Sequence, residues 1–271
     1  MTATNHSLGF ELLNVASTLA RQAGTMALIG RRGGLSEVQS KSSVTDMVTE
    51  YDRASELLVF EGLLRSRPED TIVGEEGASH SGSSGITWYI DPIDGTTNFL
   101  YSLPYWAVSI GATDEHGTLA GAVYIPAMDE LFTAVRGDGA KLNDLPIRCS
   151  TTSTLSHALV GTGFSYSAER RTVQALRIPK MIHLVRDFRR FGAASIDLCF
   201  VACGRLDAYF EENLGPWDIV AGELIAREAG CRSGNFAGQE VTTAQLLASA
   251  PALFDDLVAL ITASSTAAGQ E

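Results

Sequence analysis

Apolar side chains recur at the spacing of a helix near the start of the chain. Between Phe10 and Ile29 they are three or four residues apart, which predicts an amphipathic helix. A second helix is expected to run to about Arg65, with Thr45 or Asp46 as its N-cap. The side chains expected to face inward on this second helix are Tyr51, Ala54, Leu57, Leu58 and Leu64.

Beyond residue 70 the pattern changes to short runs of strand-forming residues. Residues 71–75 form one such run, which ends in a carboxylate. Residues 78–85, rich in serine and glycine, are expected to form a mobile surface loop. Strand patterns then dominate from Trp88 to Arg136. Turns within that region are expected at 115–117 and 137–139.

After residue 149 predicted strands and helices alternate. The expected elements are a strand at 158–164, a helix at 169–186 interrupted near Pro179, a helix at 193–203, a strand at 206–211, and a helix at 217–229 closed by Gly230. The last twenty residues predict one amphipathic helix and a polar tail.

This order of elements predicts an α+β protein with a layered αβαβα arrangement, because helices come first, then strands, then an alternation. The chain shows no internal repeat and no low-complexity linker. We therefore expect residues 1–271 to form a single domain whose two lobes share one site. The N-terminal α+β lobe is expected at about 1–148, the C-terminal α/β lobe at about 149–262, and a polar tail at 263–271.

Composition and charge narrow the possible partners. The 271 residues are 45% hydrophobic and 19% charged, which is ordinary for a globular protein. The formal net charge of −12 argues against binding to nucleic acid or to an anionic membrane, since both require a cationic surface. A small phosphorylated substrate remains compatible, because a bound metal ion can reverse the local field.

Features of the termini and the cysteines point to the cytoplasm. No basic segment leads into an apolar run at the N-terminus, and no apolar stretch is long enough to span a bilayer. The four cysteines lack paired spacing. Cys199 and Cys203 lie four residues apart on a predicted helix and are expected to be buried, reduced thiols.

The run from residue 88 to residue 99 carries the strongest chemical signal. A predicted strand delivers Asp91 and Asp94, with Pro92 between them, and Pro92 is expected to end strand pairing. Two close carboxylates repel unless a cation neutralises them, and a cluster of oxygen ligands suits Mg²⁺ rather than zinc. Gly95 and Thr96 then offer backbone N–H groups at a predicted helix start, where a phosphate can bind.

Further carboxylates lie at the ends of other predicted elements. Glu75 follows a strand, Asp218 begins a helix, and Asp52 lies on the second helix. Each alone could be an ordinary helix charge or a solvated acid. Together with Asp91 and Asp94 they are better explained as a metal site.

With these motifs the chain resembles the inositol monophosphatases of the Mg²⁺-dependent, lithium-sensitive sugar-phosphatase superfamily. The matching segments follow in order at 41–52, 74–76, 91–99 and 217–230, and Lys41 belongs to the first of them. The resemblance implies the sugar-phosphatase fold, two to three Mg²⁺ ions, and a homodimer. It also implies metal ligands: Glu75, Asp91 and the carbonyl of Ile93 for one ion, and Asp91, Asp94 and Asp218 for a second, with a third ion beside Glu75.

The resemblance assigns further roles around the metals. Thr96, paired with Asp52, would orient and deprotonate the attacking water, and Glu75 is counted among the catalytic residues. The backbone amides of Gly95 and Thr96 would hold the substrate phosphate, and Ala194 and Glu211 would contact the alcohol. Asp94 and Asp218 are also counted among the substrate-binding residues. Ala193 stands where the family usually has serine or threonine, which predicts a broader substrate range. Glu76 is expected to point to solvent, and Asp197 matches an acid typical of bacterial members.

The expected activity is hydrolysis of myo-inositol monophosphate or a similar polyol phosphate by a metal-activated water. Alternatives are a phosphatase of the same fold for histidinol phosphate, fructose 1,6-bisphosphate or 3′-phosphoadenosine 5′-phosphate, and a non-catalytic regulator that binds RNA polymerase or RNA. The arginines at 186, 189 and 190 could either contact a second anionic group or form a solvated basic face.

Overall fold

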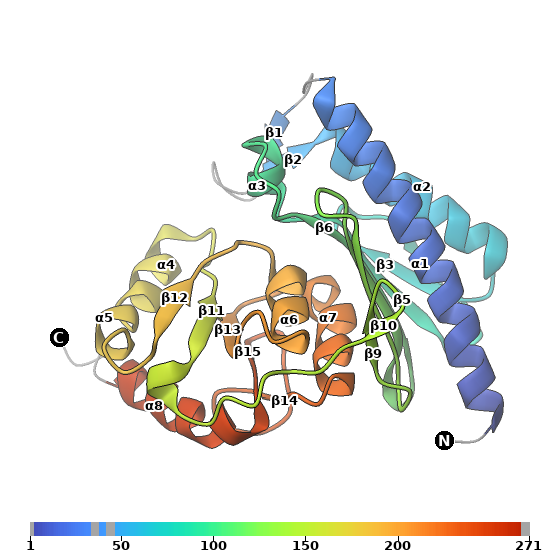
Figure 1. Cartoon of the computed structure of the whole chain (residues 1–271). Coiled ribbons are helices and arrows are strands. Elements are labelled where there is room, and N and C mark those ends of the chain that lie inside the picture. The colour runs from blue at the N-terminus through green and yellow to red at the C-terminus, as the bar shows by residue number, and fades with distance from the viewer. Residues whose placement is uncertain (1–2, 34–37, 42–46, 267–271) are drawn as a thin grey trace.

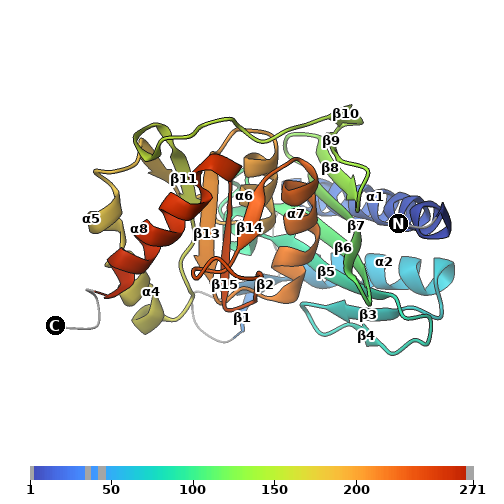
Figure 2. The same ribbon diagram turned by 90° about the horizontal axis from the view of Figure 1, so that it is seen from below.

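Two β-sheets form the framework of the chain, and helices cover both faces of each sheet (Figure 1). The computed structural model describes residues 3–33, 38–41 and 47–266. Across the molecule the layers run helix, sheet, helix, sheet, helix (Figures 1 and 2). This order confirms the predicted αβαβα arrangement.

The larger sheet has eight strands in the order β10-β9-β8-β7-β6-β5-β3-β4. Neighbouring strands are antiparallel except for β3 and β5, which are parallel. The predicted turns at 115–117 and 137–139 are confirmed, since each joins two neighbouring strands. The strands are β3 (Thr71–Gly74), β4 (Ser79–His80), β5 (Thr87–Asp94), β6 (Ala107–Asp114), β7 (Gly117–Ile125), β8 (Glu130–Val135), β9 (Ala140–Leu142) and β10 (Leu145–Pro146).

Helices α1 (Ala3–Arg32) and α2 (Glu50–Ser66) cover the outer face of this sheet (Figure 1). Leu12 and Leu63 from the two helices share one buried cluster with Trp88 and Ile110 of the sheet. The inner face packs against α6 (Ala194–Ala202) and α7 (Pro216–Glu228). A two-stranded sheet, β1 (Val38–Ser40) with β2 (Met47–Thr49), and the short helix α3 (Thr96–Leu100) complete this half.

The smaller sheet has five strands in the order β12-β11-β13-β15-β14 and lies on the other side of α6 and α7 (Figure 2). Its second face packs against α8, with Phe254 and Leu257 in the buried cluster. The elements of this half are η1 (Leu155–His157), β11 (Leu159–Thr162), α4 (Ala168–Ala175), α5 (Ile178–Met181), β12 (Asp187–Arg189), β13 (Ala208–Glu212), β14 (Arg232–Gly234), β15 (Gln245–Ser249), η2 (Pro251–Leu253) and α8 (Phe254–Thr266).

The start and the buried face of α2 differ from the prediction. Thr49 is the N-cap, and its hydroxyl accepts the N–H groups of Tyr51 and Asp52. Thr45 and Asp46 lie outside the described residues. Ala54 is exposed, and Leu57 is 55% exposed. The buried stripe of the helix instead contains three polar side chains, at positions 52, 55 and 56, because that face looks toward the site described below.

Three other expectations need correction. The segment 78–85 is not a free loop: β4 pairs with β3, and the Ser84 hydroxyl donates to Asp70 at 2.6 Å. The predicted helix at 169–186 is two short helices, α4 and α5, with Pro179 inside the second. Strands β14 and β15 were not predicted, because their short sequences carry no clear alternation.

Other features agree with the expectations or leave them open. All four cysteines are free of disulfides, with Cys199 buried and Cys203 half-buried. No helix in the described ranges combines the length and apolar character needed to cross a membrane. The division into lobes near residue 148 stays a prediction; this position lies in the connection between the two sheets.

Candidate metal centre and active site

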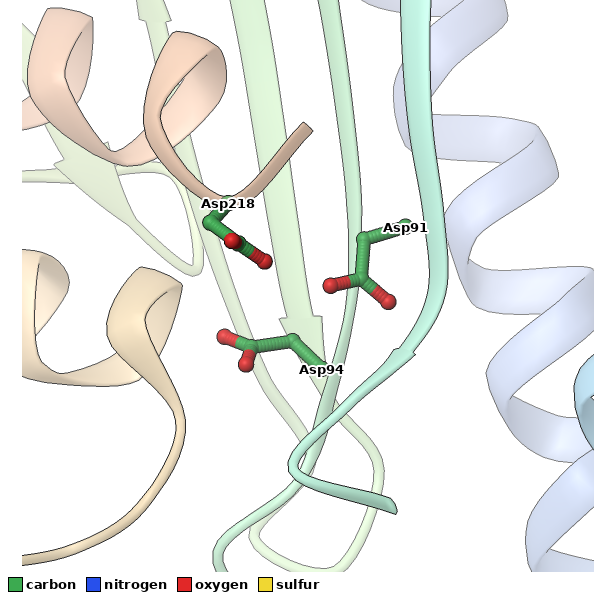
Figure 3. Close-up of side chains that lie close together, drawn as sticks. All are labelled: Asp91, Asp94 and Asp218. Atoms are coloured by element: carbon green, nitrogen blue, oxygen red, sulfur yellow. The ribbon is translucent and has the colours of Figure 1, made fainter. Parts of the chain in front are cut away.

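Three aspartates converge between the larger sheet and α7 (Figure 3). Asp91 and Asp94 come from the end of β5, and Asp218 comes from the first turn of α7. One carboxylate oxygen from each lies within 4.8 Å of the other two. Asp91 is 1% exposed and Asp94 is 7% exposed. The structure therefore brings together acids that are more than a hundred residues apart in sequence.

A bulge in β5 puts Asp91 and Asp94 on the same side of the sheet. Asp91 pairs with Ser109 and Asp94 with Ala107, so Pro92 and Ile93 together oppose one residue of β6. Side chains three residues apart in a regular strand point to opposite faces, and the extra residue of the bulge cancels that alternation. The prediction that Pro92 ends strand pairing is therefore wrong: its missing N–H interrupts the ladder locally, and pairing resumes at Asp94.

The electrostatics of the three aspartates favour a bound cation. Burial raises the pKa of Asp91 well above its usual range, and Glu75, Asp94 and Asp218 raise it further. Burial also raises the pKa of Asp218 well above its usual range, with Asp94 and Glu75 adding to the effect. Without a cation the cluster therefore holds protons readily. A hard divalent ion fits this arrangement, because the side-chain ligands are all oxygens and the crowded charges need neutralising.

Asp94 also links the end of β5 to the start of α6. Its Oδ2 accepts the Ser195 N–H at 2.7 Å and the Ser195 hydroxyl at 2.5 Å, and its Oδ1 accepts the Ala194 N–H at 3.2 Å. Burial raises the pKa of Asp94 to about 6, although the Ser195 bonds oppose that rise. Ser195 is not among the site residues predicted from the sequence. A serine at the start of a predicted helix was the available signal, but its partner lies 101 residues away.

Thr96 and Asp52 form the predicted pair. The Thr96 hydroxyl lies 3.1 Å from Asp52 Oδ1 and 3.0 Å from the carbonyl oxygen of Ile93. Asp52 Oδ2 accepts the N–H and the hydroxyl of Thr49 at 2.7 and 2.6 Å. Burial raises the pKa of Asp52, while these hydrogen bonds oppose the rise. Asp52 is thus held in one orientation, with a single oxygen left for Thr96.

Gly95 makes the turn that places Thr96 at the start of α3. Its φ of 91° lies in the left-handed region, and a Cβ there would come within 2.8 Å of the Tyr105 carbonyl oxygen. A residue with a side chain would strain both the backbone and this contact. The predicted helix start after Gly95 is confirmed.

Glu75 lines a pocket beside the three aspartates but is not one of the three clustered acids. Its Oε1 accepts a hydrogen bond from Lys41 Nζ at 2.9 Å. Lys41 also pairs with Glu76, whose side chain is only 8% exposed. Burial raises the pKa of Glu76 to about 7, although Lys41 opposes the rise. The prediction that Glu76 points to solvent is therefore wrong.

A pocket of about 310 Å³ opens beside the aspartates. Nine of the predicted site residues line it. Asp52 and Lys41 do not, but each contacts a lining residue, Thr96 and Glu75 respectively. The nine are Glu75, Asp91, Ile93, Asp94, Gly95, Thr96, Ala194, Glu211 and Asp218.

Glu211 lines the same pocket as the three aspartates. Its Oε2 accepts the Tyr209 hydroxyl at 2.5 Å, and a Cβ on Gly163 would come within 1.8 Å of the same oxygen. Burial raises the pKa of Glu211 to about 7, while Tyr209 and Arg190 oppose the rise. Asp197 lies nearby but is 1% exposed, and its Oδ1 has no hydrogen-bond partner within the described ranges.

The three arginines near residue 190 do not act as one cluster. Arg186 donates to the carbonyl oxygen of His157, and Arg189 forms an ion pair with Asp187 at 2.6 Å. Arg190 lines the pocket and lowers the pKa of Glu211. Of the three, only Arg190 is placed to contact a ligand.

Solved structures with the same fold include phosphatases. The IMPase of Thermotoga maritima matches with a TM-score of 0.86 at 28% identity, covering 97% of this chain and 100% of that one. The structure of Mycobacterium tuberculosis SuhB matches with a TM-score of 0.81 at 42% identity, covering 94% of this chain and 96% of that one.

Sequence comparison agrees with the structural likeness. The profile of the inositol monophosphatase family matches residues 10–266. Inositol-1-monophosphatase SuhB of Mycobacterium tuberculosis is 43% identical over 272 aligned positions, covering 92% of this chain and 93% of that protein. Nus factor SuhB of Pasteurella multocida is 42% identical over 253 residues, covering 91% and 94%. With a family profile spanning most of its length, the chain belongs to the inositol monophosphatase family.

Proposed function

We propose that the chain is a Mg²⁺-dependent phosphomonoesterase that hydrolyses myo-inositol monophosphate or a similar polyol phosphate to the alcohol and inorganic phosphate. The observation that carries this proposal is the buried Asp91–Asp94–Asp218 cluster beside the Thr96–Asp52 pair. The aspartate cluster supplies sites for a divalent cation. The Thr96–Asp52 pair supplies a fixed hydroxyl and a carboxylate next to those sites.

In this proposal two to three Mg²⁺ ions share the acids of the pocket. Glu75, Asp91 and the carbonyl of Ile93 would hold one ion, and Asp91, Asp94 and Asp218 a second, with any third beside Glu75. Bound ions would lower the pKa of the attacking water and stabilise the leaving oxygen.

The residues around the ions would orient the reacting groups. Thr96, held by Asp52, would position the water and pass its proton toward the Asp52 carboxylate. The N–H groups at the start of α3, from Gly95 and Thr96, would bind the phosphate. No enzyme nucleophile is required, so water attacks phosphorus directly.

Glu211, Ala193 and Ala194 would contact the alcohol part of the substrate. Glu211 would accept hydrogen bonds from substrate hydroxyls, while Ala193 and Ala194 give this part of the pocket a small, apolar surface. Because Ala193 has no hydroxyl, we expect a broader range of polyol phosphates than in a strict inositol enzyme. We also propose a homodimer.

The complete acid cluster favours catalysis over a purely regulatory role. The relative from Pasteurella multocida is named a Nus factor, but regulatory binding alone would not need three buried aspartates around one point. Phosphate release from a panel of phosphomonoesters, with and without Mg²⁺, tests the proposal. The expected result is Mg²⁺-dependent release that is fastest with a polyol phosphate. If none of the phosphomonoesters in the panel is hydrolysed, the proposal is contradicted.

Replacing Glu211 with glutamine is expected to weaken the selection of inositol phosphate over glycerol phosphate. A hydrogen bond to a charged acceptor contributes about 1.5–3 kcal/mol and one to a neutral acceptor about 0.5–1.5 kcal/mol, so the variant holds substrate hydroxyls more weakly. Glycerol phosphate should be hydrolysed nearly as well as before, since the acid cluster is untouched. The measurement is kcat/KM for both esters.

The neighbouring carboxylate provides a matched control for this variant. Glu212 also lines the pocket but is already paired with Arg177 at 3.0 Å. Glu212→Gln should therefore leave the preference between the two esters unchanged. Equal losses on both esters in Glu211→Gln would show that Glu211 supports the fold or the metals instead of selecting the alcohol.

Li⁺ is expected to inhibit the reaction, and added substrate should relieve the inhibition poorly. The Asp91–Asp94–Asp218 site offers three carboxylates, which a monovalent ion neutralises less completely than a divalent one. Li⁺ held there with product phosphate would delay the next cycle. Initial rates measured at several substrate concentrations test this expectation. Full relief by substrate would show that Li⁺ competes elsewhere.

A further inference from the structure

One buried face of α2 holds three separate parts of the site in place. Asp52, Ser55 and Glu56 lie at positions i, i+3 and i+4, which share one face of a helix. All three are at most 4% exposed. Burying polar side chains is costly unless each one makes hydrogen bonds, and each of these does.

The three side chains reach three different segments of the active site. Asp52 accepts the hydroxyl of Thr96, as described above. The Ser55 hydroxyl donates to the carbonyl oxygen of Pro92 at 3.1 Å, within the bulge that separates Asp91 from Asp94. Glu56 reaches the turn that follows β3, where Glu75 lies.

The contacts of Glu56 are the most extensive of the three. Oε2 accepts the Glu76 N–H and Oε1 accepts the Ala78 N–H, both at 2.8 Å. A Cβ on Gly74 would come within 2.2 Å of Oε2, so the absent side chain allows this close approach. No ion-pair partner of Glu56 lies within the described part of the chain, and its two oxygens are used by backbone N–H groups.

These bonds fix Glu75 from one side while the sheet fixes it from the other. The Glu75 N–H donates to the Ile90 carbonyl oxygen at 3.1 Å, which ties it to β5 one residue before Asp91. Its successor, Glu76, is tied to α2 through Glu56. The Glu75 side chain therefore leaves a backbone whose position is set by both β5 and α2.

We propose that Glu56 is a positioning residue that fixes the turn carrying Glu75 and so sets the affinity of the metal centre at its Glu75 end. The inference rests on the proposed function, in which Glu75 is a metal ligand. In addition to supplying Asp52, α2 would then hold the segments that carry the proposed metal ligands at fixed distances from one another. Groups that orient metal ligands in this way typically change metal affinity about 10–100-fold when they are replaced.

The test is Mg²⁺ binding measured by calorimetry on the full chain, together with kcat at saturating Mg²⁺. Glu56→Gln keeps the shape of the side chain but places an amide NH₂ against a backbone N–H. We expect Mg²⁺ binding about 10–100-fold weaker, with kcat restored to within a few-fold at high Mg²⁺. Glu61→Gln is the matched control, because Glu61 lies on the same helix with its side chain 57% exposed.

Testing Glu56→Gln in a protein that also carries Glu75→Gln shows whether Glu56 positions Glu75 or only stabilises the fold. If Glu56 acts through Glu75, Glu56→Gln should have little further effect on Mg²⁺ affinity in a Glu75→Gln protein. A lowered melting temperature with unchanged Mg²⁺ affinity, or equal effects in both backgrounds, would overturn the inference and leave the proposed function standing. If Glu56→Gln does not fold, Gly74→Ala replaces it, because the added Cβ would displace Glu56 Oε2 from the Glu76 N–H. Weaker Mg²⁺ binding is again the expected result. Absence of Mg²⁺ binding by the unchanged protein would overturn both proposals.

Discussion

Replacing Asp91 with asparagine is expected to lower phosphate release at least about a thousandfold, or about 4 kcal/mol of transition-state stabilisation. Asp91 is the acid that both proposed metal positions share, so one substitution weakens both. Asparagine has nearly the same shape, and removing one charge from three crowded carboxylates relieves repulsion. The metal-free variant should therefore be at least as stable as the unchanged protein.

Two measurements on the purified variant separate metal loss from unfolding. The unchanged protein should gain melting temperature on addition of Mg²⁺, whereas Asp91→Asn should gain little, since a ligand stabilises only the state that binds it. Asp255→Asn is the control, because Asp255 lies on α8 with its side chain 79% exposed. Turnover by Asp91→Asn close to that of the unchanged protein would exclude the proposed metal centre.

Local motifs could be predicted from sequence because their geometry is encoded within a few residues. The strand that leads to Asp91 follows from strand propensity, and the turn at Gly95 follows from glycine, although Pro92 misleadingly indicated an end to pairing before Asp94. The meeting of these acids with Asp218 did not follow from spacing. It was expected because the motifs resemble a known family in the same order.

Buried polar contacts could not be predicted in the same way. The hydrophobic pattern of α2 predicted an inward face that includes Leu57, whereas the structure buries Ser55 and Glu56 instead. A pattern analysis assumes that apolar residues face the core, and it fails where a helix face serves a site. For a related reason Ser195 was not predicted and Glu76 was wrongly expected to point to solvent, since each is buried by a partner far away in sequence.

Thr96 gives the second large expected effect. Thr96→Ala should lower kcat about 10²–10⁴-fold while KM stays within a few-fold, because a group that orients water and moves its proton acts mainly in the transition state. Thr96→Ser keeps the hydroxyl and should recover much of the rate. Measuring kcat and KM for both variants at saturating Mg²⁺ separates the lost hydroxyl from the lost methyl group.

Asp52, the hydrogen-bond partner of Thr96, allows a second test of the same role. Asp52 leaves Oδ1 for Thr96 while Oδ2 accepts both groups of Thr49, so Asp52→Asn should disturb the same function from the other side. If the two residues work as one unit, the double variant should be hardly slower than the worse single variant, since the second change removes nothing that still operates. Additive losses would mean that they act separately. An unchanged kcat with a large rise in KM for Thr96→Ala would mean that Thr96 only binds phosphate, and the water would then need another base.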